Sequence, residues 1–141
     1  MTAPTSPSQF RSGLDHIYTA LTAESATLPG IVDASLQAQS KVLEILQLAA
    51  RAGLVRENDP GFWSLTGKMR RTKFRDGVTR QWYLENSPFG VSKLNAYFAG
   101  FVSKSQLYYS LQRLRKDETI EITVTRDGSR TPIYNAKEPT V

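Results

Sequence analysis

The chain has 141 residues, and 40% of them are hydrophobic, which is enough for the packed interior of one domain or of two very small domains that share a core. It has no cysteine and a single histidine, so disulfides and thiolate metal sites are excluded, and a histidine-based metal site or catalytic triad is not expected. The formal net charge is +5, and no apolar run approaches the length of a membrane span or a secretory leader, so we expect a cytoplasmic protein.

The N-terminal part of the chain is predicted to be helical. Residues 1–9 are rich in Pro, Ser and Thr and predict a disordered tail. Apolar residues at helical spacing then predict an amphipathic helix over 9–24, and the sequence TLPG at 27–30 is expected to break it. A second helix is predicted over 35–52. We interpret residues 10–62 as a helical part that adds core and forms a homodimer interface.

A strongly basic segment follows these helices. Residues 63–84 predict a β-ribbon closed by Asp76-Gly77, because Asp-Gly between extended runs is a hairpin signal. Between residues 66 and 84 there are six basic side chains against one acidic side chain. Concentrated positive charge is typical of proteins that bind a polyanion. We therefore expect the ribbon to contact phosphates through its basic residues, which are Lys68, Arg70, Arg71, Lys73, Arg75 and Arg80.

Residues 91–116 read as two helices joined by a tight turn. Gly100 supplies the turn, where a positive φ costs glycine least. Ser103 and Gln106 have the spacing of a capping box at the start of the second helix, 103–116. Leucines at i, i+4 and i+7 of this helix are expected to face the core. By elimination Lys104, Ser105, Tyr109, Gln112 and Lys116 face outward, with Tyr108 and Arg113 near the edges.

A second two-stranded ribbon completes the chain. Apolar and polar residues alternate over 120–125, which predicts a half-buried strand, and 132–136 is the return strand. The turn between them contains Asp127-Gly128 and has an arginine on each side, Arg126 and Arg130. Arginines at such a tip suit a narrow, negatively charged minor groove.

The block from 91 to 136 resembles the winged helix-turn-helix superfamily, broadly the MarR, ArsR and PadR groups of bacterial regulators. The matching residues are SKL at 92–94, YFAG at 97–100, SKSQL at 103–107 and LQRL at 111–114, with IEI, DGSR and PIY in the ribbon that forms the wing. The resemblance implies an α+β fold, a recognition helix at 103–116 and, usually, a dimeric DNA-binding regulator.

One departure from the superfamily leaves two architectures open. The superfamily normally has an extra helix just before the block, where this chain has the predicted basic ribbon. Either the helix near 41–52 takes that place and the ribbon is inserted, or the N-terminal half is a second, degraded winged helix. Tandem winged helices occur in plasmid replication initiators, so the second architecture has a functional meaning.

We interpret the chain as an α+β winged helix-turn-helix protein with additional N-terminal helices and a basic β-ribbon, in which residues 85–141 form the helix-turn-helix and wing. The expected function is binding of double-stranded DNA, as a nucleoid-associated transcriptional regulator. Lys104, Ser105 and Tyr109 are expected to read the major groove, and Arg113 and Lys116 to contact phosphates.

Two other functions stay open at this point. One is a replication or recombination accessory factor of plasmid or phage type, in which both halves contact DNA. The other is a protein-interaction winged helix whose basic ribbon binds RNA or an acidic partner.

The sequence does not indicate an enzyme. Asp15 and His16 are adjacent, but no nucleophile motif accompanies them, and they are predicted to be a surface pair. The carboxylates are dispersed without metal-ligand spacing, and no Gly-rich phosphate loop is present. We therefore expect no catalytic residues, no metal and no cofactor.

Overall fold

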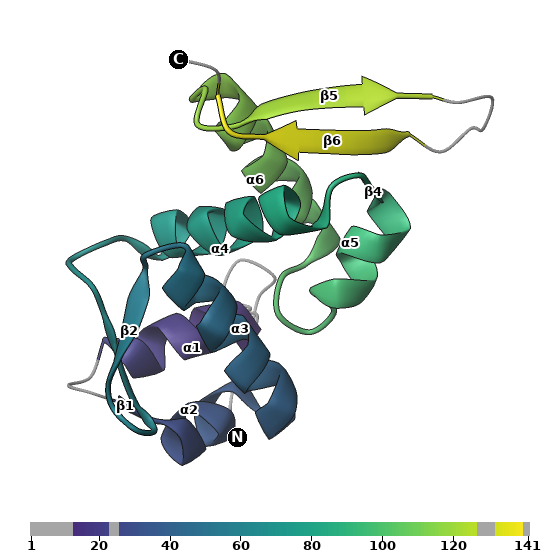
Figure 1. Ribbon diagram of the computed structural model, residues 1–141. Helices are drawn as coiled ribbons and strands as arrows, with labels where there is room; N and C mark the ends of the chain where they lie inside the picture. The colour runs from purple at the N-terminus through teal and green to yellow at the C-terminus, as the bar shows by residue number, and fades with distance from the viewer. Residues whose placement is uncertain (1–12, 23–25, 127–131, 140–141) are drawn as a thin grey trace, which may run out of the picture.

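Six helices and two three-stranded antiparallel sheets make up the residues that the structure describes, 13–22, 26–126 and 132–139 (Figure 1). This computed structural model has the mixed α+β composition that the sequence predicts. None of the described helices is long and apolar enough to cross a membrane. In chain order the elements are α1 (Gly13–Leu21), β1 (Ala26–Thr27), α2 (Leu28–Ser35), α3 (Gln39–Arg51), β2 (Val55–Asp59), β3 (Phe62–Leu65), α4 (Arg71–Asn86), β4 (Phe89–Gly90), α5 (Val91–Tyr97), α6 (Lys104–Lys116), β5 (Glu121–Thr125) and β6 (Ile133–Lys137).

The same order of elements occurs twice along the chain. The first unit runs from α1 to β3 and the second unit from α4 to β6, each as helix, short strand, two helices and a hairpin. In each unit the short strand pairs with the last strand, which gives the sheet orders β1-β3-β2 and β4-β6-β5. The registers correspond as well, because Ala26 lies opposite Trp63 and Phe89 lies opposite Tyr134.

One hydrophobic core runs through both units. The ring of Tyr18 in α1 lies 5.8 Å from the ring of Phe74 in α4. The N–H of Gly13 donates to the carbonyl oxygen of Gly100 at 2.9 Å, so the start of α1 is fixed to the turn between α5 and α6. Because apolar burial is the main favourable contribution to folding, each unit stabilises the other.

The apolar stripes of the N-terminal helices face this shared core. Leu14 and Ile17 in α1, and Val42 and Ile45 in α3, are fully buried within the chain. A homodimer through the N-terminal helices stays a prediction, and it would have to use side chains other than these four.

Residues 71–86 form a helix, α4, so the β-ribbon predicted over 63–84 is wrong for most of its length. Phe74, Val78 and Trp82 are buried along one side of this helix. Their spacing of four residues is compatible with a helix and with a strand, because residues four apart lie on the same face in both. In Figure 1, α4 crosses the middle of the molecule between the first unit and the β5–β6 hairpin.

The Asp76-Gly77 pair that signals a hairpin turn has a different role in the folded chain. A Cβ atom on Gly77 would lie 2.7 Å from Cδ1 of Leu54, so the glycine permits close packing of α4 against the first unit. The Asp76 carboxylate accepts two hydrogen bonds from Arg113 in α6. Tertiary contacts, and not a turn, therefore explain both residues.

The hairpin of the first unit lies earlier in the chain than predicted. Strands β2 and β3 pair around a tight turn in which Gly61 has a φ of +83°. The sequence at 27–30 begins helix α2 and does not end helical structure. The Thr27 hydroxyl accepts a hydrogen bond from the N–H of Gly30 at 3.2 Å, and Pro29 lies in the first turn, where its missing N–H costs nothing.

Candidate nucleic-acid interface

Helix α6 begins at the capping box that the sequence predicts. The Ser103 hydroxyl accepts a hydrogen bond from the N–H of Gln106 at 3.1 Å, and the Gln106 side chain accepts one from the N–H of Ser103 at 3.2 Å. Gly100, in the turn before it, has a φ of +83°, as the tight turn requires. Local sequence signals therefore set the start of this helix.

The inner face of α6 packs on the core and on α4. Leu107, Leu111 and Leu114 are buried, as their spacing predicts. Ser110 is also buried, and its hydroxyl lies 2.8 Å from the hydroxyl of Thr79 in α4. This hydrogen bond satisfies two buried polar groups and fixes the rotation of α6 about its axis.

The outer face of α6 is polar, aromatic and free of acidic residues. Tyr108 and Tyr109 are 59% and 60% exposed, and their ring centroids are 5.6 Å apart. The helix contains no aspartate or glutamate. The structure brings six of the seven predicted side chains of this helix to the surface, and these are Lys104, Ser105, Tyr108, Tyr109, Gln112 and Lys116.

Arg113, the seventh, lies in an ion pair between helices. Its Nε and Nη2 donate to the two carboxylate oxygens of Asp76 at 2.8 and 2.7 Å. The hydrogen bond from Arg113 to Asp76 raises the pKa of Arg113. The pair joins α6 to α4, so the main role of Arg113 is to position these two helices.

The basic residues of the predicted ribbon divide into two groups. Lys68, Arg70 and Lys73 are exposed and Arg71 is half-buried, all on the segment that leads into α4 or on its first turn. The second group, Arg75 and Arg80, makes contacts within the fold.

Arg75 and Arg80 hold parts of the chain together. The side chain of Arg75 is 17% exposed, and its Nε lies 3.3 Å from a carboxylate oxygen of Asp15. Asp15 itself is buried, so the predicted surface pair with His16 is wrong. Nε of Arg80 donates to the carbonyl oxygen of Thr119 at 2.9 Å. These partners are distant in sequence, so no sequence pattern revealed them.

The β5–β6 hairpin places one predicted arginine at the surface. Arg126 follows β5 directly and is exposed, whereas Arg130 lies outside the described residues. At the base of the hairpin, Lys137 lies 3.4 Å from Glu121. Figure 1 shows strands β5 and β6 extending away from the helices.

Helix α3 holds the place in the first unit that α6 holds in the second, but two of its basic side chains, those of Lys41 and Arg51, contact the other unit. Nζ of Lys41 lies 3.6 Å from the ring centroid of Tyr97. Arg51 donates to Glu85 at 2.8 Å. Burial, together with the neighbouring Glu44 carboxylate, raises the pKa of Tyr97. No sequence pattern indicated this asymmetry between the two helices.

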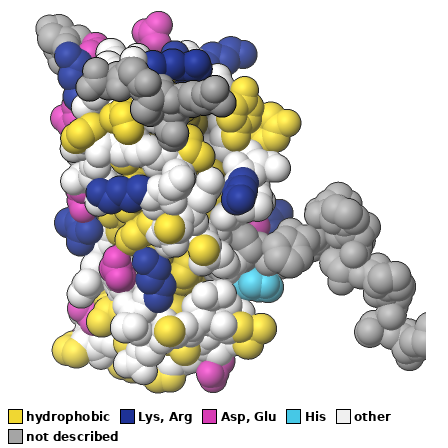
Figure 2. Space-filling model, turned by 90° about the vertical axis from the view of Figure 1, so that its right-hand side faces the viewer, with side chains coloured by type: hydrophobic (Ala, Val, Ile, Leu, Met, Phe, Trp, Pro, Cys, Tyr) yellow, Lys and Arg dark blue, Asp and Glu magenta, His cyan; other side chains and the backbone are white. Residues whose placement is uncertain are grey.

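Positive charge lies at several separate places on one face of the molecule. Figure 2 shows Lys and Arg side chains interspersed with hydrophobic, uncharged and acidic side chains on this face. Among the described residues no group of three His, Asp or Glu side chains is arranged to hold a metal ion.

No protein-family model and no curated protein matches the chain. Among solved structures it is similar to the DIP2311 protein from Corynebacterium diphtheriae, at 16% sequence identity and a TM-score of 0.34. The match covers 87% of this chain and 25% of that protein, so the chain spans about a quarter of its length. A likeness this slight carries no argument about fold or function.

Proposed function

We propose that the protein binds double-stranded DNA as a transcriptional regulator and that each unit is a winged helix-turn-helix. The order of helix, short strand, two helices and hairpin in both units supports this assignment. In this proposal α6 is the recognition helix and the β5–β6 hairpin is the wing. In this proposal the first unit is the other winged helix of a tandem. The alternative architecture, a single winged helix with an inserted ribbon, is then not needed.

The exposed face of α6 is the observation that carries the proposal. A helix in the major groove needs donors and acceptors on its outer side, and its N-terminal turns contact base edges. Lys104, Ser105 and Tyr109 occupy those turns and are exposed. The absence of acidic residues from α6 matters because a carboxylate there would repel phosphates.

Phosphate contacts are assigned to six of the predicted DNA-binding cations, of which five are exposed and Arg71 is half-buried. These are Lys68, Arg70, Arg71, Lys73, Lys116 and Arg126. Arg75, Arg80 and Arg113 instead position helices and loops through their contacts within the fold.

The proposal is tested by selecting preferred sequences from random duplexes and measuring affinities by fluorescence anisotropy. Replacing Lys104, Ser105 and Tyr109 with alanine should reduce discrimination between preferred and random duplexes, by about 1–3 kcal/mol for each side chain that hydrogen-bonds a base edge. Replacing Arg70, Arg71 and Lys73 should instead weaken binding to all duplexes alike and lower its salt dependence.

Two results would contradict the proposal. Equal affinity for duplex DNA, single strands and RNA would exclude a sequence-reading regulator. Unchanged sequence preference in the Lys104, Ser105 and Tyr109 variant would show that α6 is not the recognition helix.

The repeated architecture favours one second candidate, a replication or recombination accessory factor in which both units contact DNA. Ser40 and Gln47 on α3 remain exposed beside its contacts with the second unit. If α3 also reads DNA, replacing both residues with alanine will reduce sequence preference. The footprint that the unmodified protein protects on DNA will then span two recognition sites. If only α6 reads DNA, the Ser40 and Gln47 variant will bind DNA like the unmodified protein. It is then the matched control for the variant that lacks Lys104, Ser105 and Tyr109.

A further inference from the structure

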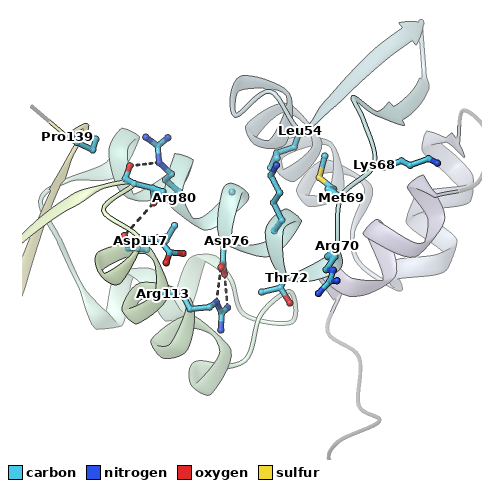
Figure 3. Close-up of a pocket in the computed structure, with 14 residues that line it drawn as sticks. Leu54, Lys68, Met69, Arg70, Thr72, Asp76, Arg80, Arg113, Asp117 and Pro139 are labelled. Atoms are coloured by element: carbon cyan, nitrogen blue, oxygen red, sulfur yellow. Dashed lines mark hydrogen bonds and ion pairs between the residues drawn. The ribbon is translucent and has the colours of Figure 1, made fainter. Parts of the chain in front are cut away.

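A groove of about 1000 Å³ lies where the two units meet. Leu54, between α3 and β2, lines one side together with Lys68 and Met69, which lie on the segment after β3. Arg113 and other residues from the end of α6 onward line the other, and the first half of α4 lies between them (Figure 3). This volume is at the upper end of the range of small-molecule sites in proteins.

The charge of the groove is positive. Its lining contains the cations Lys68, Arg70, Lys73, Arg80 and Arg113 and two carboxylates, those of Asp76 and Asp117. The Asp76 carboxylate is neutralised by its ion pair with Arg113. A groove with this balance attracts anions and disfavours cations.

The groove also offers apolar surface. Leu54, Met69, Leu114 and Pro139 line it, and the methylene stems of its lysines and arginines add to this surface. Inorganic ions would leave the apolar part unused. A ligand with an apolar body and an anionic group would match both parts of the lining.

We propose that this groove binds a small organic anion, in which an apolar body carries a carboxylate, sulfonate or phosphate group. Figure 3 shows Thr72 between Arg70 and Arg113, so a hydroxyl and two guanidinium groups lie along the same part of the groove. Asp76 occupies Nε and Nη2 of Arg113, which leaves the donors at Nη1 for the anionic group. Binding to the groove does not depend on the proposed DNA-binding function.

The test uses 8-anilinonaphthalene-1-sulfonate as the anionic probe and N-phenyl-1-naphthylamine, which has a similar aromatic body without the sulfonate, as the neutral probe. Binding is followed by the increase in probe fluorescence on titration with the full chain. The groove variant is Arg70→Gln with Lys73→Gln, because both side chains are exposed and their replacement should not disturb the core. The matched control is Lys93→Gln, an exposed lysine on α5 that does not line the groove.

The groove variant should raise the Kd of the sulfonate probe about tenfold, which is about 1.4 kcal/mol, because charge-assisted hydrogen bonds to the sulfonate are lost. The Kd of the neutral probe should differ by no more than about twofold between the unmodified chain and the groove variant. The Lys93→Gln protein should bind both probes like the unmodified chain. Near-ultraviolet circular dichroism confirms that each variant is folded. An unchanged Kd for the sulfonate probe in the groove variant would overturn the proposal, as would no binding of this probe to the unmodified chain.

Discussion

At the scale of single residues, Gly13 shows how closely the two units approach. A Cβ atom at this position would lie 2.6 Å from the carbonyl oxygen of Gly100 and 3.2 Å from the ring of Phe101. The Gly100 oxygen is backbone and also accepts the Gly13 hydrogen bond, so it cannot move aside without breaking that bond. Only glycine fits here without a shift of α1 against the second unit.

Gly13→Ala should therefore lower the free energy of unfolding by about 1–3 kcal/mol, as overpacking does elsewhere. The matched control is Gly67→Ala, because a Cβ atom at Gly67 meets nothing within 4 Å and its φ is not positive. That variant should stay within about 1 kcal/mol of the unmodified chain or gain slightly in stability. Urea denaturation measures both values. Equal stability of the two variants would show that α1 adjusts freely against the α5–α6 turn.

At the scale of elements, the sequence predicted α6 and the turn before it well, because local signals determine them. The Ser103 capping box and the Gly100 turn fixed the start of α6, and leucine spacing identified its exposed face. Helix α4 was missed because four-residue spacing fits a strand as well as a helix, and because Asp76-Gly77 resembles a turn. Whether a cation is free for a ligand depends on partners far away in sequence, as with Arg113, and no local pattern reveals them.

Two of the arginine–carboxylate pairs of helix α4, one with α6 and one with α3, differ in exposure. The Asp76 side chain is 16% exposed, whereas Glu85, which pairs with Arg51, is 32% exposed. Asp76→Asn should lower the free energy of unfolding by about 1–3 kcal/mol, because it leaves a half-buried Arg113 without its carboxylate. Glu85→Gln, the matched comparison, should cost less than about 1 kcal/mol, because solvent screens this pair.

The two variants are compared by chemical denaturation between pH 7 and pH 3. The hydrogen bond from Arg51 lowers the pKa of Glu85. A carboxylate with a lowered pKa stabilises the fold above its unfolded pKa, and this contribution disappears as the pH falls through the folded pKa. The difference between the unmodified chain and Glu85→Gln should therefore shrink toward pH 3. If Glu85→Gln lowers the free energy of unfolding more than Asp76→Asn does, the Arg51–Glu85 pair and not the Arg113–Asp76 pair contributes more to stability, and the prediction is contradicted.

At the scale of the whole molecule, the repeated architecture does not divide the chain into two independent domains. The core is continuous, α1 packs against α4, and the side chains of α3 contact α4 and α5. These contacts engage Lys41 and Arg51 of α3, whereas the outer face of α6 stays exposed, so two units of the same design present different surfaces. The repeat also forms the groove, since its lining comes from both sides of the junction. Separation of the units would remove the groove and expose apolar surface from both.

Both units should consequently unfold in one cooperative transition. Each contains one buried tryptophan, Trp63 in the first unit and Trp82 in the second. In Trp82→Phe the fluorescence reports on the first unit, and in Trp63→Phe it reports on the second, while far-ultraviolet circular dichroism reports on all helices. In each variant the fluorescence and dichroism midpoints in urea should coincide, which is the test of two-state unfolding. If the fluorescence midpoint of one variant alone lies at a lower urea concentration than its dichroism midpoint, the unit that contains the remaining tryptophan unfolds independently. The shared core would then not couple the two units.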